Sequence, residues 1–106
     1  MKELIRKLVE SYGPSGQEGP VRTLIEDLIR DHVDEMRVDA MGNLIALKKG
    51  AGDGLRLVVA AHMDEIGLIV THVDEKGFLR FARVGGVQPV SLVAQRVRFS
   101  NVRQGV

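Results

Sequence analysis

Apolar residues recur at helical spacing in the first third of the chain. Residues 2–12 carry an apolar stripe formed by Leu4, Ile5, Leu8 and Val9, with charged residues on the opposite side, and residues 20–32 repeat this pattern. Positions with this spacing share one face of a helix. The pattern therefore predicts two amphipathic helices, at residues 2–12 and 20–32, with a break at Gly-Pro-Ser-Gly, residues 13–16.

The break also carries signals for the start of the second helix. Ser15 is followed three residues later by Glu18, which is the spacing of a capping box that satisfies free backbone N–H groups of the first turn. Pro20 fits in that turn because its missing N–H is not needed there. We interpret Ser15 as a helix cap and not as a nucleophile, since it lacks the G-x-S-x-G context.

From residue 35 onward, the apolar spacing changes to that of short strands. Two strands are expected around a turn at residues 39–43, and two more, at residues 66–73 and 78–83, around a turn at residues 74–77. The strand at 78–83 alternates and should be half-buried. Alternation resumes at residues 93–102, through Val97, Phe99 and Val102. The glycine-rich stretch 50–54 precedes a strand, so we interpret it as a hairpin tip and not as a phosphate loop.

One apolar run, at residues 57–61, is continuous and does not alternate with polar positions. Such a run predicts a strand that is buried on both faces. His62, Asp64 and Glu65 follow it directly, at the strand end where open α/β sheets tend to bind ligands. The order of elements therefore predicts an α/β fold with its candidate chemistry at His62.

Two interpretations of the His62 group stay open on the residues alone. On a strand, His62 and Asp64 face the same side, so Asp64 could hold the second N–H of a metal-bound imidazole through its carboxylate or its backbone. Alternatively, this is a solvated strand end in which the His-x-Asp spacing is incidental. Glu65 faces away from Asp64. His32, at a helix end, and His72, in a strand, are expected to be structural.

Composition and charge narrow the class of protein. The 106 residues are 44% hydrophobic and 27% charged, with a net charge of +1. These values are typical of a globular domain and argue against a nucleic-acid partner held by a basic field. The absence of cysteine excludes disulfides and fits a reducing compartment. Without a signal peptide or a membrane-spanning run, a cytoplasmic protein with no membrane partner is expected.

The segment Ala-His-Met-Asp-Glu-Ile-Gly at residues 61–67 resembles the signature of a family of dinuclear metallo-aminopeptidases. This family contains the tetrahedral, deblocking and glutamyl aminopeptidases, and some members are labelled endoglucanase or cellulase. The similarity covers further motifs, in order, along nearly the whole chain: residues 14–18, Asp39, Gly42-Asn43, residues 84–86, Pro89, Leu92 and residues 95–97. Residues 90–94 depart from it, because a glycine usually precedes the Gln-Arg pair.

The resemblance implies a division of the chain at residue 68. Residues 1–68 would be the N-terminal part of a mixed-sheet α/β catalytic domain. Residues 69–106 would begin a small β-barrel-like dimerisation domain, through which subunits form dimers and a dodecamer. The resemblance also implies two divalent metal ions, zinc or cobalt, with His62 as a metal ligand and Asp64 as the catalytic-site residue that orients it. The implied activity is removal of the N-terminal residue of a peptide by a metal-activated water.

The other metal ligands and the general base that the resemblance implies have no counterpart in this sequence. We therefore expect the chain to be an N-terminal fragment of such an enzyme and to be inactive alone. A competing hypothesis is a non-catalytic β-rich interaction module with an incidental His-x-Asp. A glycosidase, suggested by the labels of some relatives, would need two convergent carboxylates, which the sequence does not indicate.

Overall fold

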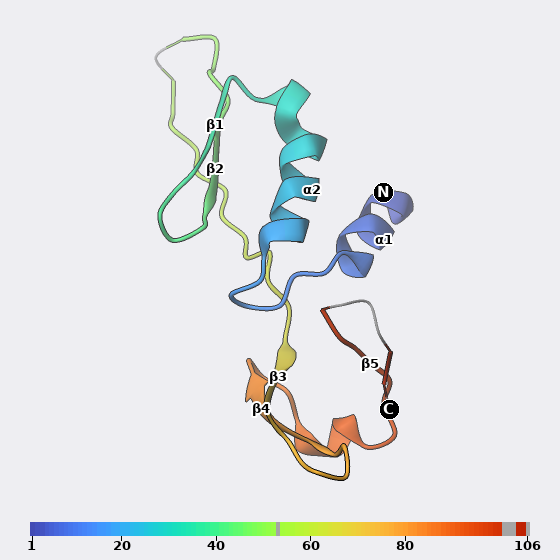
Figure 1. Cartoon of the computed structure of the whole chain (residues 1–106). Helices are drawn as coiled ribbons and strands as arrows, with labels where there is room; N and C mark the ends of the chain where they lie inside the picture. Colours follow the sequence, from blue (N-terminus) through green and yellow to red (C-terminus); the bar gives the residue numbers. More distant parts are fainter. Residues whose placement is uncertain (53, 101–103, 106) are drawn as a thin grey trace. The chain divides into compact units, whose positions relative to one another are not determined.

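The computed structural model of the chain describes residues 1–52, 54–100 and 104–105. They form helices and antiparallel hairpins that cluster in two compact units (Figure 1). Residues 1–13 and 17–64 make up the first unit, and residues 14–16 and 65–106 make up the second. The fold is thus mixed α/β, as the sequence predicts, with three antiparallel two-stranded sheets in the described part of the chain.

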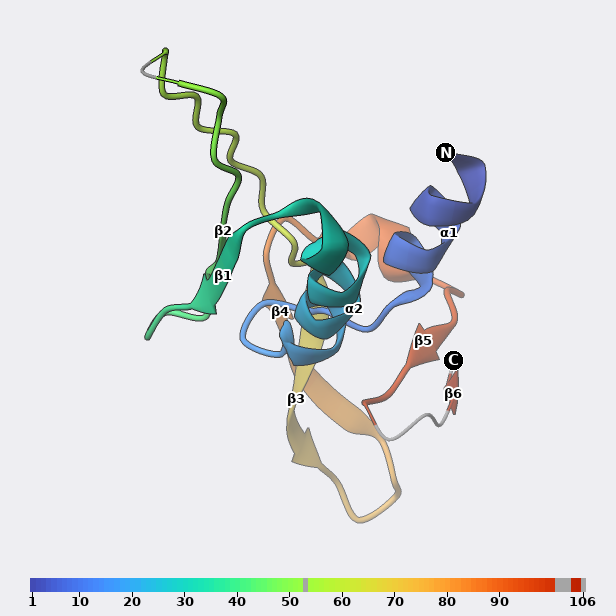
Figure 2. The same ribbon diagram turned by 90° about the horizontal axis from the view of Figure 1, so that it is seen from above.

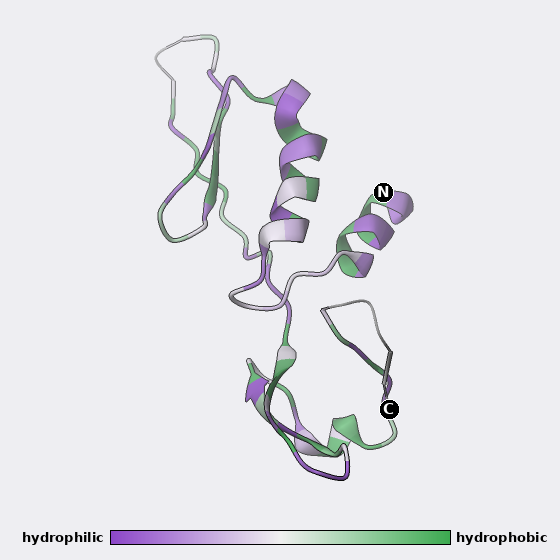
Figure 3. Cartoon of the chain, in the orientation of Figure 1, coloured by the Kyte–Doolittle hydropathy of each residue, from purple (hydrophilic) through white to green (hydrophobic). Residues whose placement is uncertain are grey.

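Both predicted helices are present. Helix α1 spans Lys2–Glu10 and helix α2 spans Gly19–Ile29, followed by the 3-10 turn η1 at Arg30–His32. Figure 3 shows polar and apolar residues on each helix, in keeping with the amphipathic pattern. No helix of the described residues has the length and apolar character needed to cross a membrane.

The start of α2 differs from the prediction. The N-cap residue is Glu18, and its side chain makes no capping hydrogen bond to the helix. The predicted capping box at Ser15 is therefore wrong, because the helix begins after Glu18 and its first turn does not include Ser15. Pro20 does lie in the first turn, where a missing N–H is tolerated.

The first unit contains one hairpin. Strands β1, Glu35–Val38, and β2, Leu44–Leu47, pair antiparallel with Val38 opposite Leu44. The turn between them, residues 39–43, was predicted and is confirmed. The Asp39 carboxylate accepts hydrogen bonds from the backbone N–H of Met41 and Asn43, both at 2.9 Å. Asp39 therefore closes the turn in the manner of an Asx-turn.

The second unit is mostly β structure. Strands β3, Gly67–Val73, and β4, Leu79–Val84, form an antiparallel hairpin with an irregularity between Val70 and His72 (Figure 2). After it come the 3-10 turn η2, Pro89–Leu92, and the short strands β5, Val97–Arg98, and β6, Gln104–Gly105, which pair antiparallel. The turn at residues 74–77 is confirmed.

One prediction for this unit is wrong, and another holds only in part. Residues 79–83 of β4 are exposed, and not half-buried, because little of the described chain covers either face of the hairpin. In the described residues 93–100, where the sequence indicates alternation and short β structure, Val97 and Arg98 form the strand β5, and alternation alone does not supply a pairing partner for the rest. Val102 lies outside the described residues.

The largest departure concerns residues 57–61, which the sequence predicts to be a buried strand. Residues 55–64 form no strand, and Leu57, Val58 and Val59 are each 86% exposed. The apolar run indicates a segment that requires cover, but it does not identify what covers it. Among the described residues, no strand pairs with the run, so it has neither edge nor face partners.

Candidate functional site

A cavity of about 150 Å³ lies in the first unit, beside the segment that follows the apolar run. Three parts of the chain line it: the N-cap of α2, the β1–β2 turn and residues 61–64. The lining residues are Glu18, Met41, Gly42, Asn43, Ala61, His62, Met63 and Asp64. Residues far apart in the sequence therefore meet at His62.

His62 and Asp64 are in direct contact. The imidazole Nδ1 lies 3.0 Å from Oδ1 of the Asp64 carboxylate and 3.1 Å from the Asp64 backbone oxygen. A backbone carbonyl can only accept, so Nδ1 carries the hydrogen and donates it. In the neutral imidazole, the free lone pair is then on Nε2. The side chain of His62 is 86% exposed, so Nε2 is accessible to a ligand.

This tautomer suits metal binding through Nε2. A metal-bound histidine commonly gives its other ring N–H to a carboxylate or a backbone carbonyl, and Asp64 presents both. His62 therefore fits a metal ion as a single ligand through Nε2. The described residues contain no group of three or more His, Asp or Glu side chains arranged to hold a metal ion, so further ligands would come from elsewhere.

Close packing holds the segment beside His62 in place. Gly13 lies against Val21, which is 5% exposed and is the buried apolar residue of the first unit. A Cβ built on Gly13 would lie 2.6 Å from Val21 Cγ1 and 3.7 Å from the Met63 carbonyl oxygen. Only glycine allows this approach, so Gly13 lets the link between the helices pack against α2 and the chain at Met63.

The structure brings together some of the predicted residues and separates others. His62 and Asp64 meet, although not on a strand as predicted, and their roles remain a prediction. His32 ends the turn η1, and His72 lies in β3 opposite Arg80. Glu18 and Asn43 line the cavity, but their sequence context indicates a helix cap and a turn, and no spacing in the sequence links them to His62.

A larger cavity of about 540 Å³ lies in the second unit, between β4 and η2. Its lining is mainly apolar: Phe81, Ala82, Arg83, Pro89, Leu92 and Val93. This lining offers no carboxylate or imidazole for acid–base or metal chemistry. The smaller cavity at His62 is therefore the candidate functional site.

Several known proteins are similar to this chain. Lysyl aminopeptidase of Pyrococcus furiosus is 47% identical over 98 residues, which are 92% of this chain and 28% of that protein. An aminopeptidase from Desulfurococcus kamchatkensis has a similar structure, with a TM-score of 0.87 and 42% identity over 96% of this chain and 29% of its own. A Thermotoga maritima protein described as an endoglucanase has a TM-score of 0.86 and 42% identity, over 94% of this chain and 32% of its own.

The chain thus spans less than a third of the length of these relatives. The sequence profile of the M42 glutamyl aminopeptidases matches residues 42–106, which include the end of the β1–β2 turn, strand β2, the His62 segment and the second hairpin. This match covers more than half of the chain, and it agrees with the resemblance noted at residues 61–67. The chain belongs to the M42 glutamyl aminopeptidase family.

Proposed function

We propose that this chain is part of a metal-dependent aminopeptidase and that it supplies one metal ligand, His62. The observation that carries the proposal is the contact of His62 Nδ1 with Asp64 at 3.0 Å, which leaves Nε2 for a metal ion. The family membership supports the activity, since similar proteins are named aminopeptidases.

In this proposal, two divalent ions, zinc or cobalt, bind in the complete site, and Nε2 of His62 holds one of them. Bound metal supplies an activated water for hydrolysis of the first peptide bond of a peptide. Asp64 fixes the tautomer and the ring orientation of His62 and raises the basicity of the ligand. The cavity beside His62 receives part of the peptide.

The proposal extends to the organisation of the whole enzyme. Residues 1–68 belong to its catalytic domain, and residues 69–106 begin a dimerisation domain through which subunits form dimers and a dodecamer. Exposed apolar side chains on the β3–β4 hairpin support an interface there, because such patches commonly mark contact surfaces: Ile69, Val70, Val73 and Phe81. The absence of cysteine supports a cytoplasmic location.

A chimera tests the proposal. This chain replaces the matching 29% of the Desulfurococcus kamchatkensis aminopeptidase, and release of p-nitroaniline from aminoacyl-anilides is measured together with metal content. We expect activity in the chimera, and we expect His62→Ala to abolish it and to remove one metal equivalent. His72→Ala and His32→Ala are the matched controls and should retain both. Full metal content and activity in the His62→Ala chimera would exclude His62 as a ligand.

The endoglucanase description of the Thermotoga maritima relative raises a glycosidase as the alternative. Two carboxylates, Glu18 and Asp64, do line the cavity, but Asp64 is hydrogen-bonded to His62, which favours its role beside a metal-bound imidazole over a role in a pair of glycosidase carboxylates. We expect no hydrolysis of carboxymethyl-cellulose by the chimera. Cellulose hydrolysis that is lost in Glu18→Gln and kept in His62→Ala would favour the glycosidase.

A further inference from the structure

The two hairpin turns of the chain are closed in the same way. Each begins with an aspartate whose Oδ1 accepts two backbone N–H groups at 2.9 Å, at residues 41 and 43 in the first turn and at residues 76 and 78 in the second. Each has a glycine with positive φ at the fourth position, Gly42 at +86° and Gly77 at +87°. The bonds common to both turns are therefore sufficient to close a hairpin of this kind.

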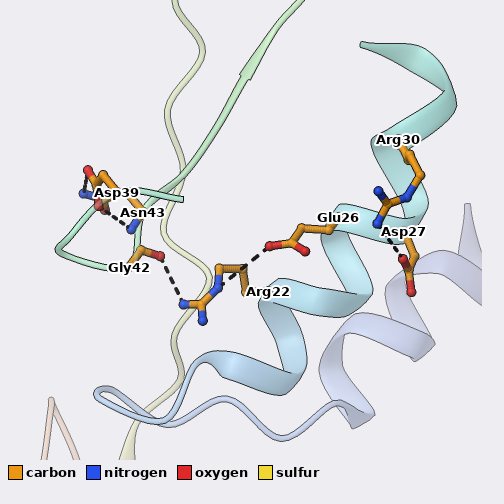
Figure 4. Close-up of polar contacts among 7 residues, drawn as sticks. All are labelled: Arg22, Glu26, Asp27, Arg30, Asp39, Gly42 and Asn43. Carbon is orange, nitrogen blue, oxygen red and sulfur yellow. Dashed lines mark hydrogen bonds and ion pairs between the residues drawn. The ribbon is translucent and has the colours of Figure 1, made fainter. Parts of the chain in front are cut away.

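The first turn has a further contact, which comes from helix α2. Arg22 Nη1 donates a hydrogen bond to the Gly42 carbonyl oxygen at 3.2 Å (Figure 4). Arg22 Nε lies 3.9 Å from Oε1 of Glu26, and the two side chains are 26% and 24% exposed. The ion pair with Glu26 thus orients the Arg22 guanidinium along the helix. The same guanidinium is hydrogen-bonded to the β1–β2 turn.

The Arg22 guanidinium also leaves little space for a side chain at position 42. A Cβ built on Gly42 would lie 3.3 Å from Arg22 Nη1, whereas a Cβ on Gly77 would meet nothing within 4 Å. The Arg30–Asp27 pair at the end of the same helix is different, because its side chains are 60% and 65% exposed. An exposed pair of this type contributes little to stability, so Arg30 serves as a control for Arg22.

The turn that Arg22 holds is a wall of the cavity at His62. Gly42 and Asn43 line this cavity together with His62 and Asp64. We propose that Arg22 is a positioning residue of the site, which fixes the β1–β2 turn so that the turn contacts the bound peptide beside His62. This inference rests on the proposed function. In this inference, the turn contacts a part of the peptide that does not react, so its contact is the same in the ground state and the transition state. Such uniform binding affects KM and leaves kcat unchanged.

Kinetics in the chimera described above test the inference. We expect Arg22→Met to raise KM about tenfold with kcat within about twofold of the parent, as loss of a hydrogen bond from a charged donor predicts. Arg22→Lys keeps a charged donor and should recover most of the affinity. Arg30→Met should have the same KM and kcat as the parent chimera.

Gly42→Ala disturbs the same contact from its other side and leaves Arg22 and Glu26 intact, so it decides the matter if Arg22→Met does not fold. Its control is Gly77→Ala, which carries the same backbone strain at a φ of +87° without a neighbour. We expect a raised KM only for Gly42→Ala. A parental KM in Gly42→Ala, with an inactive His62→Ala chimera, would overturn the inference and leave the proposed function standing.

Hydrogen exchange of the 106-residue chain, measured by mass spectrometry, gives a readout that does not depend on activity. We expect Arg22→Met to speed exchange in the peptide that contains residues 39–43 but not in the one that contains residues 74–78. Arg30→Met should alter neither. Unchanged exchange at residues 39–43 in Arg22→Met would show that Arg22 does not hold the turn, whatever the activity of the His62→Ala chimera.

Discussion

At the scale of single residues, the Nδ1–H group of His62 has two hydrogen-bond acceptors, and Asp64 supplies both of them. The carboxylate and the backbone oxygen of Asp64 lie 3.0 and 3.1 Å from Nδ1. The backbone oxygen is present whatever side chain stands at position 64. The tautomer of His62 is therefore secured in part by the backbone, and loss of the carboxylate should cost less than loss of the imidazole.

Asp64→Ala in the chimera should thus weaken zinc binding by about tenfold, the low end of the range for partners of metal-bound histidines, while His62→Ala should remove one equivalent. Competition with a chelator measures the affinity, and His72→Ala serves as the control. If Asp64→Ala lost one equivalent of bound zinc, as His62→Ala is expected to, Asp64 itself would bind the metal.

The pairing of His62 with Asp64 could be predicted because the two residues are close in the sequence, so that local geometry alone brings them together. The rest of the cavity could not be predicted in this way. Glu18 and Asn43 reach His62 through the packing of α2 and the β1–β2 turn, and the contact of Arg22 with Gly42 spans 20 positions. No local pattern encodes such contacts.

At the scale of elements, the β1–β2 turn depends on the charge of Asp39. The Asn43 side-chain amide donates to Asp39 Oδ2 at 2.9 Å, and this bond is the largest cause of a lowered pKa of the Asp39 carboxyl, below its ordinary value of 3.8. The backbone N–H groups of Asn43 and Met41 act in the same direction. The ionised form is favoured in the folded turn, so its stabilising effect is complete above pH 3.8 and is lost as pH falls through the lower folded pKa.

We therefore expect the turn to open in acid. Protection of the amides at residues 41 and 43 against hydrogen exchange, corrected for the intrinsic rate, should be high at about pH 6 and should fall as the pH drops below 3.8. Asn43→Ala removes the largest cause of the shift and should move the loss to higher pH. Protection that is unchanged over this pH range in the parent chain would contradict the role of the Asp39 charge.

The elements that the sequence predicts well are those with their own local signals. Helices α1 and α2 follow from apolar stripes, and the hairpins follow from the Asp-x-x-Gly turns at residues 39–42 and 74–77. The start of α2 was mispredicted because Ser15 and Glu18 have the spacing of a capping box, although Glu18 is itself the N-cap. The short strand β5 depends on its pairing with β6, and alternation alone does not identify a pairing partner.

At the scale of the whole molecule, few of the apolar side chains are covered. Val21 and Val87 are the buried hydrophobic residues of the described part of the chain, while Leu57, Val58 and Val59 are each 86% exposed. The prediction of a buried strand at residues 57–61 is therefore wrong for the described chain. The prediction failed because a strand at the centre of a sheet needs a pairing partner on each edge, and a run of apolar residues does not indicate whether the chain supplies these partners.

The isolated 106-residue chain should have no aminopeptidase activity. A catalytic zinc site ordinarily needs about three protein ligands, and the described residues offer no such group. The purified chain with added zinc or cobalt should release no more p-nitroaniline than its His62→Ala variant. Release that exceeds this variant would mean that the chain holds a complete site.

The isolated chain should also associate with itself. Leu57, Val58 and Val59 are consecutive and each 86% exposed, and an exposed apolar patch favours contact with other chains. Light scattering at micromolar concentration should give a mass well above the 11.6 kDa of one chain. Leu57→Lys places a charge in the run and should lower the associated mass, whereas Thr23→Lys, which adds the same charge at an exposed position of α2, should not. A compact monomer in the parent chain would show that the exposed run does not drive association, and it would favour the interaction-module hypothesis.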